Sequence, residues 1–422
     1  MPHQVAVTVK ADIRPGQVSA LKKWLAEVDS GGRRVELFPF ERLPVHFARL
    51  IVLDDDVDLD GAPIPASVAF LSDVDAPVDR YLDELCEIAA PGLDGAFGHC
   101  EGYPTAPYPR ARAEWLQARM IQSSAVYVNT VGRSVEQVRA ERRLRDAIEE
   151  FLDEGGRNWS GATADDVRSA VRRHVVSDPD LSWAKRRARR PEWRWRLREA
   201  AHLLGIGAAG LLLLPALLLV VPLWLLAIRL NELRDVPSTG PPDPARVDEL
   251  TRAEDRIVQN QFSAVGYLKP GWLRRVTVVS VLFGIDVASR HLFNRGSLAG
   301  IKTIHFARWT FIDDSRRLLF TSNYDGSLES YMDDFIDKVA WSLNAAFSNG
   351  VGYPRTRWLI GGGARDEEAF KNYIRNRQVP TQLWYSAYPD LTALNIGANA
   401  RLRAGLRGSM AAERAEEWAR LL

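Results

Sequence analysis

Alternation of apolar and polar residues predicts strands at corresponding places in the two ends of the chain. The stretch Val5–Ile13 alternates and is rich in β-branched residues, which is typical of a strand. Further strands are predicted at Phe47–Leu53, Ala66–Leu71 and Ser124–Asn129, and again at Phe306–Ile312, Leu318–Ser322 and Gln382–Tyr388. Aspartate pairs or turn residues follow several of these strands and mark their ends.

Helical periodicity fills the intervals between these strands. The first helix of each half is predicted at Val18–Val28 and, longer and more apolar, at Trp272–Leu292. The second, at Val78–Ala90 and Leu328–Phe347, is amphipathic and carries acidic residues in its first turn, where the helix dipole favours them. An arginine-rich helix follows the last strand of each half. The order β-α-β-β-α-β is that of a ferredoxin-like unit.

The two halves also share sequence. His46-Phe47-Ala48-Arg49 recurs as His305-Phe306-Ala307-Arg308, and residues 70–104 align without a gap on residues 320–354 with 12 of 35 positions identical. This pattern indicates a tandem duplication. We therefore expect a ferredoxin-like repeat at residues 1–154, an insertion at 155–258 and a second repeat at 259–422.

Two fused ferredoxin-like copies resemble the dimeric α/β-barrel superfamily, in which two sheets face each other and close a barrel. Within it, the arrangement is similar to the dye-decolourising peroxidase and chlorite dismutase group of haem proteins. The peroxidases carry Gly-x-x-Asp-Gly with the Asp as distal acid, and the nearest match here, Ser322–Gly326, has Ser at the first position and places Asp325 at the acid. The resemblance implies an α+β pseudo-dimeric barrel, haem as a candidate cofactor, and a peroxidase-like oxidoreductase acting on an amphipathic or lipid-derived substrate.

The insertion contains a long apolar segment. Leu203–Ile228 has no charged side chain over 26 residues. As one helix it would be about 39 Å long, more than the ~30 Å hydrocarbon core of a bilayer. Contact with a bilayer is therefore expected at Trp193, Trp195, Arg196, Leu212, Pro215 and Trp224. The alternative is a buried central helix of a soluble protein.

A basic collar, residues 185–198, precedes the apolar segment. It holds eight Lys and Arg residues against one acidic residue, Glu192, with tryptophans interleaved. Basic residues and indoles beside an apolar stretch are typical of the headgroup region. The same composition also suits an arm that binds RNA or DNA, but the apolar neighbour favours lipid.

Two topologies are compatible with the apolar segment. The charge asymmetry favours a single span whose N-terminal side is cytosolic. The duplication instead favours a one-sided helical hairpin, broken near Pro215 and Pro222, because two halves on opposite sides of a bilayer could not cover each other's sheets. Both topologies predict a membrane-associated protein, and the hairpin, which we favour, places its soluble parts in the cytoplasm.

Composition narrows the function classes. Lys+Arg 55 against Asp+Glu 54 argues against a nucleic-acid partner for the chain as a whole. Two cysteines, Cys86 and Cys100, exclude a disulfide scaffold and fit a reducing compartment. The chain contains no Gly-x-Ser-x-Gly and no His-Glu-x-x-His, which argues against a hydrolase and against a zinc enzyme.

Candidate catalytic residues come from the second copy. Arg308 is expected to hold an anionic oxygen and Asp325 to carry protons, with His305 beside them. Their counterparts His46, Arg49 and Asp75 occur in the first copy, so the alternative is a structural network that fixes a strand turn in both halves.

Candidate binding residues are also concentrated in the second copy. Asn323, Tyr324, Tyr331, Trp384 and Tyr385 are expected around a cavity for a flat or lipid-like ligand, unless these aromatic residues are plain core. His291, on the long apolar helix, is the candidate ligand of haem iron; the alternative is a hydrogen-bonded or exposed histidine.

These features leave two functions open. One is the peroxidase-like enzyme, and the other is a membrane-anchored barrel without catalysis that binds a lipid or a protein. The expected partners are a lipid bilayer and an amphipathic small molecule, and pairing of whole molecules into a homo-oligomer stays open.

Overall fold

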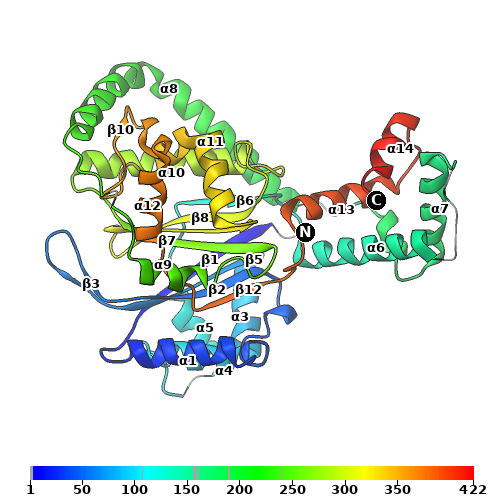
Figure 1. The fold of residues 1–422 in the computed structure, drawn as a ribbon, viewed down its shortest axis with the longest axis horizontal. Coiled ribbons are helices and arrows are strands. Elements are labelled where there is room, and N and C mark those ends of the chain that lie inside the picture. Colours follow the sequence, from blue (N-terminus) through cyan, green and yellow to red (C-terminus); the bar gives the residue numbers. More distant parts are fainter. Residues whose placement is uncertain (1–2, 107, 155–158, 160, 189–190, 239) are drawn as a thin grey trace.

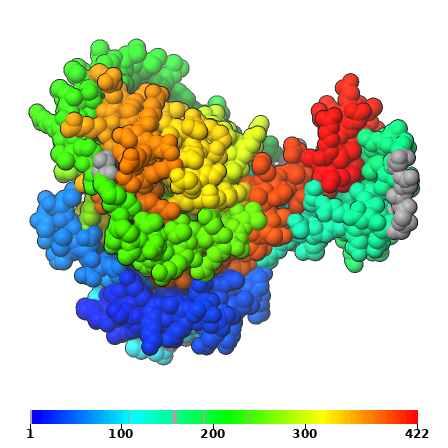
Figure 2. Space-filling view, in the orientation of Figure 1, coloured from blue at the N-terminus to red at the C-terminus, as the bar shows by residue number. Residues whose placement is uncertain are grey.

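The computed structural model describes residues 3–106, 108–154, 159, 161–188, 191–238 and 240–422, and over this range the chain is α+β with antiparallel sheets. Two four-stranded sheets lie one above the other at the centre, and helices cover their outer faces (Figure 1). An arm of helices extends to one side, which the space-filling view also shows (Figure 2).

Each sheet takes three strands from one half of the chain and the fourth from the other half. The first sheet has the order β1 (Gln4–Asp12), β5 (Ser67–Asp75), β2 (Val45–Leu53) and β12 (Leu383–Ser386). The second has the order β6 (Ala125–Val128), β8 (Ile304–Ile312), β9 (Arg317–Asp325) and β7 (Gln259–Tyr267). The strands expected from alternation are thereby confirmed, and β5 and β9 extend further than expected.

The expected closed barrel is wrong, because the strands described here form open sheets. The chain before each exchanged strand first touches the opening strand of its own half, through the single bridges Val9–Met120 and Ala264–Gln378. It then crosses to the other sheet, where β6 pairs with β8 and β12 pairs with β2. A single bridge at each crossing is not extended into a ladder of paired residues between the two sheets, so the sheets stay separate.

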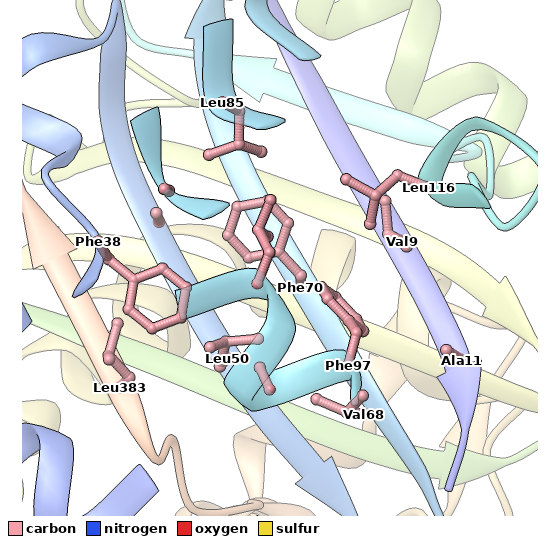
Figure 3. Packing of buried hydrophobic residues seen from close by; sticks show 14 of the residues in the cluster. Val9, Ala11, Phe38, Leu50, Val68, Phe70, Leu85, Phe97, Leu116 and Leu383 are labelled. Carbon is pink, nitrogen blue, oxygen red and sulfur yellow. The ribbon is translucent and has the colours of Figure 1, made fainter. Parts of the chain in front are cut away.

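The outer face of the first sheet is covered by α1 (Val18–Ser30), α3 (Val78–Ile88), α4 (Ala90–Phe97) and α5 (Pro109–Gln117). Alternate residues of the strands point into this layer, as the cluster around Phe70, Phe97 and Phe38 shows (Figure 3). The strand residues of this core are the apolar positions of the alternating pattern that predicts the strands.

The outer face of the second sheet is covered by α10 (Trp272–His291), α11 (Leu328–Phe347) and α12 (Glu367–Arg377). The arm consists of α6 (Val135–Asp153), α7 (Ala164–Ser177), α13 (Ala393–Gly405) and α14 (Ala412–Ala419). The remaining elements are α2 (Arg34–Leu37), η1 (Phe40–Arg42), β3 (Asp56–Val57), β4 (Pro63–Ile64), η3 (Ser182–Lys185), α8 (Trp193–Glu232), α9 (Pro244–Thr251), β10 (Thr356–Arg357), β11 (Gly361–Gly362) and η4 (Gly363–Arg365).

Two arginines join the inner faces of the sheets. Arg49 on β2 reaches the second sheet, where it donates to Phe262 O (2.8 Å) and Ser322 O (2.9 Å). Arg308 on β8 reaches the first sheet in the same way, donating to Val7 O (2.7 Å) and Ser72 O (3.0 Å). Both side chains are buried, and buried polar groups need hydrogen-bond partners. The backbone carbonyl groups of the opposite half are the partners of each guanidinium group.

The network around these arginines carries one carboxylate for two positive charges. Asp73 forms an ion pair with Arg308, whereas the corresponding position in the second half is Asn323, which accepts from Arg49 and donates to Asp73 (3.2 Å). Burial lowers the pKa of Arg49 to about 9, opposed by the charge of Asp73 and assisted by that of Arg308. Asp73 is therefore the group that makes both buried cations tolerable.

We expect Asp73→Asn to lower the free energy of unfolding by about 3–5 kcal/mol, because it leaves two buried guanidinium groups without a carboxylate. Urea titration of the detergent-solubilised protein measures this change. The control is Asp314→Asn, whose side chain is 94% exposed and pairs with Arg316 at 3.6 Å. It should change stability by less than about 0.5 kcal/mol, and equal losses in the two variants would contradict the assignment.

Candidate membrane and ligand site

The apolar segment forms part of one continuous helix, α8. The helix runs for 40 residues through both Pro215 and Pro222, so the expected break near these prolines is wrong. Each proline removes one intrahelical hydrogen bond and bends the helix without ending it. Figure 1 shows α8 as an arch above α10.

Both ends of the arch contact the second half of the chain. Near its start, His202 Nδ1 lies 3.1 Å from His291 Nε2 of α10. Near its end, Trp224 Nε1 donates to Thr277 Oγ1 of α10 (3.1 Å). At its last residue, the buried Glu232 accepts from Thr356 Oγ1 and from Leu359 N, both at 2.8 Å.

The arch must bow away from α10 between these contacts. From His202 to Trp224 the helix rises by about 33 Å, whereas α10 covers only about 21 Å from His291 to Thr277. The excess length has to curve outward. Since both ends return to one body and the two sheets face each other, a single span with the halves on opposite sides of a bilayer does not fit this geometry.

Nearly all of the apolar surface of α8 is exposed. Of its most apolar 18-residue window only 6% is buried, and by length and composition the helix could cross a membrane. Leu212 is 80% exposed and Trp193 is 68% exposed. The collar also lies on the surface: Trp195 stacks on His3 at 5.2 Å and Arg196 is exposed. Arg189 and Arg190 of the collar lie outside the described residues.

The helix α10 adds a second exposed apolar row. Trp272, Val276, Val279 and Phe283 follow one another at helical spacing and are 48–77% exposed. Exposed apolar surface of this extent on two neighbouring helices is not typical of a soluble monomer. The arch and this row together form the exposed apolar surface of the molecule.

An apolar cavity of about 280 Å³ lies beneath α10, between α10, α11, α12 and the outer face of the second sheet. Val281, Gly284, Ile285 and Ala288 of α10 line it and are at least partly exposed, and we infer that its mouth lies along this side of α10. Its floor and far wall include Phe262, Trp309, Phe320, Phe335, Val339 and Phe370. The residue Val339 has non-helical backbone angles, which bends α11 beside the cavity.

Two polar groups of this lining have no hydrogen-bond partner. Ser289 Oγ and Trp309 Nε1 are buried, and neither contacts a polar atom of the part of the chain that the structure describes. Buried hydroxyl and indole N–H groups nearly always have partners. An apolar cavity with two unpaired polar groups suits a molecule that is mostly hydrocarbon with one polar end.

The residues expected to bind substrate do not come together. Tyr331 lines the cavity and Tyr324 stacks on it with ring centroids 3.9 Å apart. Asn323 lies between the sheets and accepts from Trp384 Nε1 (3.1 Å). Tyr385 is buried in the core of the first sheet, where its hydroxyl accepts from Arg139 (2.9 Å). Of the five residues, only Tyr324 and Tyr331 are near the cavity.

The residues expected to carry catalysis lie between the sheets. His305 Nε2 is 2.7 Å from Asp325 Oδ1, and Asp325 Oδ2 accepts from the backbone N–H of Ala393 at the start of α13 (2.8 Å). Asp325 thus pairs with His305, while Arg308 pairs with Asp73. The carboxylate also satisfies a free N–H at a helix N-terminus, as the dipole favours.

The first half repeats this arrangement. His46 Nε2 is 3.2 Å from Asp75 Oδ1, and Asp75 Oδ2 accepts from Val135 N at the start of α6 (3.0 Å). The two histidines line a space of about 30 Å³, which is enough for roughly one water molecule. Such a pair of matched contacts holds α6 and α13 against the sheets, and it offers no room for an organic substrate.

Haem does not fit the residues around the cavity. No histidine or cysteine occurs among the described residues of its lining, and the hydroxyl of Tyr331 is already bonded to Ser322 (2.8 Å). His291 is outside the lining and faces His202 of α8. Met332 is part of the wall, but methionine holds haem iron together with a histidine, and the described lining has none.

Ser289, Trp309 and Gly284 are residues that the sequence analysis missed. A signal for the helix residues was present in the small side chains of Gly284 and Ala288, four positions apart on an otherwise bulky helix. Comparisons of this chain with protein-family models, curated proteins and solved structures found no match.

We expect Ser289→Ala to leave the free energy of unfolding unchanged or slightly higher, because it removes a buried hydroxyl without a partner. The control is Ser322→Ala, which takes the acceptor from the buried hydroxyl of Tyr331 and should cost about 1–3 kcal/mol. Urea titration in the absence of ligand measures both. A loss in Ser289→Ala as large as in the control would show that the hydroxyl is bonded.

Proposed function

We propose that this protein docks on one face of an anionic bilayer through α8 and α10 and binds an amphipathic lipid-like molecule in the cavity beneath α10. The observation that carries the proposal is the exposure of α8, which is apolar on all sides and yet anchored at both ends to the same body. A helix of this kind is stable only where something apolar surrounds it.

A bilayer is the surrounding that the charges favour. The basic collar stands immediately before the apolar arch, with Trp193 exposed among its arginines. Basic residues attract anionic headgroups and indoles prefer the interface, while the leucines beyond them enter the acyl region. Because the cytoplasmic leaflet is the more anionic one, we infer that both halves of the protein face the cytoplasm.

The finer architecture belongs to this proposal. We infer that residues 1–154 and 259–422 are ferredoxin-like repeats that exchange their fourth strands, β6 and β12. Two correspondences support it: Arg49 makes the same kind of contact in one half as Arg308 makes in the other, and Asp75 the same as Asp325. An exchanged pair cannot separate, so the insertion between the repeats has to leave and return on one side.

The position of the cavity suggests that docking on the bilayer also brings a lipid-like ligand to its binding site. Its mouth is on α10, the helix whose exposed row forms part of the proposed docking surface. A hydrocarbon chain leaving the bilayer would enter apolar surroundings directly, and a single hydroxyl, ester or carboxyl group could pair with Ser289 or Trp309. Binding rather than oxidation is the function that this geometry supports, because the described cavity wall holds no histidine or cysteine that could bind haem iron.

We expect Leu212→Asp to weaken binding to vesicles of phosphatidylcholine with phosphatidylserine by at least about tenfold, since a carboxylate in the acyl region is strongly disfavoured. Cosedimentation measures the affinity. The control is Val57→Asp at another exposed apolar residue (59% exposed), which belongs to β3 and is far from the arch in the sequence. Equal binding of both variants would contradict docking through α8, as would wild-type binding that ignores phosphatidylserine and salt.

We expect Gly284→Leu to lower the affinity for a fluorescent fatty-acid analogue by at least about tenfold, because the new side chain would occupy the mouth of the cavity. No heavy atom lies within 4 Å of the position a Cβ would take there, so the fold should tolerate it. The control, Gly207→Leu on α8, has the same open space. Undiminished binding in Gly284→Leu would place the ligand elsewhere and leave docking on the bilayer untouched.

A further inference from the structure

Three side chains that are typical metal ligands meet where the start of α8 touches the end of α10. Glu199 and His202 come from α8 and His291 comes from α10, and one ligand atom of each lies within 4.8 Å of the others. All three residues are partly buried. The group is separate from the cavity, whose lining includes none of them.

We propose that Glu199, His202 and His291 bind one divalent transition-metal ion of the zinc class, which fastens the base of the α8 arch to α10. Two imidazole nitrogens bound to one tetrahedral zinc at about 2.0–2.1 Å lie roughly 3.3 Å apart. His202 Nδ1 and His291 Nε2 are 3.1 Å apart, close to that spacing. Glu199 and His202 are three positions apart, which puts them on one face of the helix, as in Glu-x-x-His metal sites.

The carboxylate of Glu199 independently supports a cation at this place. Its Oε2 is buried and has no hydrogen-bond partner among the described residues. Among the described residues, the cationic group that pairs with it is Arg290, whose Nη1 is 3.9 Å from Oε1, too far for a hydrogen bond; Arg290 instead bonds Asp286 at 2.8 Å. A buried carboxylate oxygen without a donor is costly, and a bound cation removes that cost.

A second cluster of acidic residues, on the surface, differs from this one because it already contains a cation. Glu329, Asp333 and Glu367 also converge, but the ammonium group of Lys371 sits among them at 2.5–2.7 Å and neutralises them. That cluster already contains its cation. Within the described part of the chain, no lysine or arginine lies within hydrogen-bond distance of the carboxylate of the histidine-containing group. Nitrogen ligands favour zinc-class ions over magnesium or calcium.

Three protein ligands leave the fourth position of a tetrahedral ion to water. The ion would sit just before Leu203, between the end of the basic collar and the start of the apolar segment of α8. It would hold this end of α8 as Glu232 holds the other end. The inference does not depend on lipid binding, because the ligands and the arch are present in the isolated protein.

The test uses the full-length protein in detergent micelles, stripped with a chelator and then titrated with Zn²⁺ by calorimetry and with Co²⁺ by visible absorption. We expect one ion per chain and an absorption spectrum of tetrahedral Co²⁺. His202→Ala and His291→Ala should each weaken binding by more than about 100-fold, and Glu199→Gln by about tenfold. Zn²⁺ should raise the melting temperature of the wild type but not that of the two histidine variants.

Two variants keep the test decisive. Glu367→Gln changes the Lys371 cluster and should bind Zn²⁺ as the wild type does, which excludes loosely held surface ions. His202→Asn retains a polar partner for His291 but lacks the imidazole ligand, so it serves if the alanine variant does not fold. A wild type that binds no Zn²⁺, or that binds it equally in His202→Asn and His291→Ala, would overturn the proposal and leave a plain histidine–histidine hydrogen bond.

Discussion

The contact between the inner faces of the two sheets constrains everything else in this molecule. Arg49 and Arg308 each cross from their own sheet to backbone carbonyls of the other, and the single carboxylate of Asp73 compensates both charges. Exchange of β6 and β12 adds a mechanical link, since each sheet contains a strand of the opposite half. Two halves held in this way cannot lie on opposite sides of a bilayer, so the chain between them must leave and return on one side.

The arch follows from that constraint. A helix as apolar as α8 would ordinarily cross a membrane, but here both of its ends contact the second half of the chain, at α10 and at the segment of β10. It therefore curves outward, and its leucines remain exposed for lipid to cover. The cavity lies under the same helix α10, so the proposed docking surface and the proposed ligand entry lie on one side of the molecule. The first sheet, whose outer face is packed by residues such as Phe38 and Phe97, contributes stability (Figure 3).

The order of strands and helices could be predicted from the sequence because period-two and helical patterns are local. Asp73 and Asp75 interrupt that pattern, so the extension of β5 could not be predicted; their partners Arg308, Val135 and His46 lie 29 or more positions away. Arg308 and Asp325 were expected together, but facing sheets place Arg308 on Asp73 and Asp325 on His305. The cavity depends on how α10 and α11 pack, which no single segment encodes. Glu-Ala-Ala-His at 199–202 was visible, but its third ligand is 89 positions from His202.

One-sided docking is tested most directly by labelling in sealed vesicles. Asp60→Cys in the first half and Asp314→Cys in the second place single thiols at exposed positions, and the native Cys86 and Cys100 are buried and should stay unreactive. A maleimide that cannot cross the bilayer should label both positions from the same side, and neither from the other side. Labelling of the two thiols from opposite sides would contradict the account, because the sheets could then not contact each other.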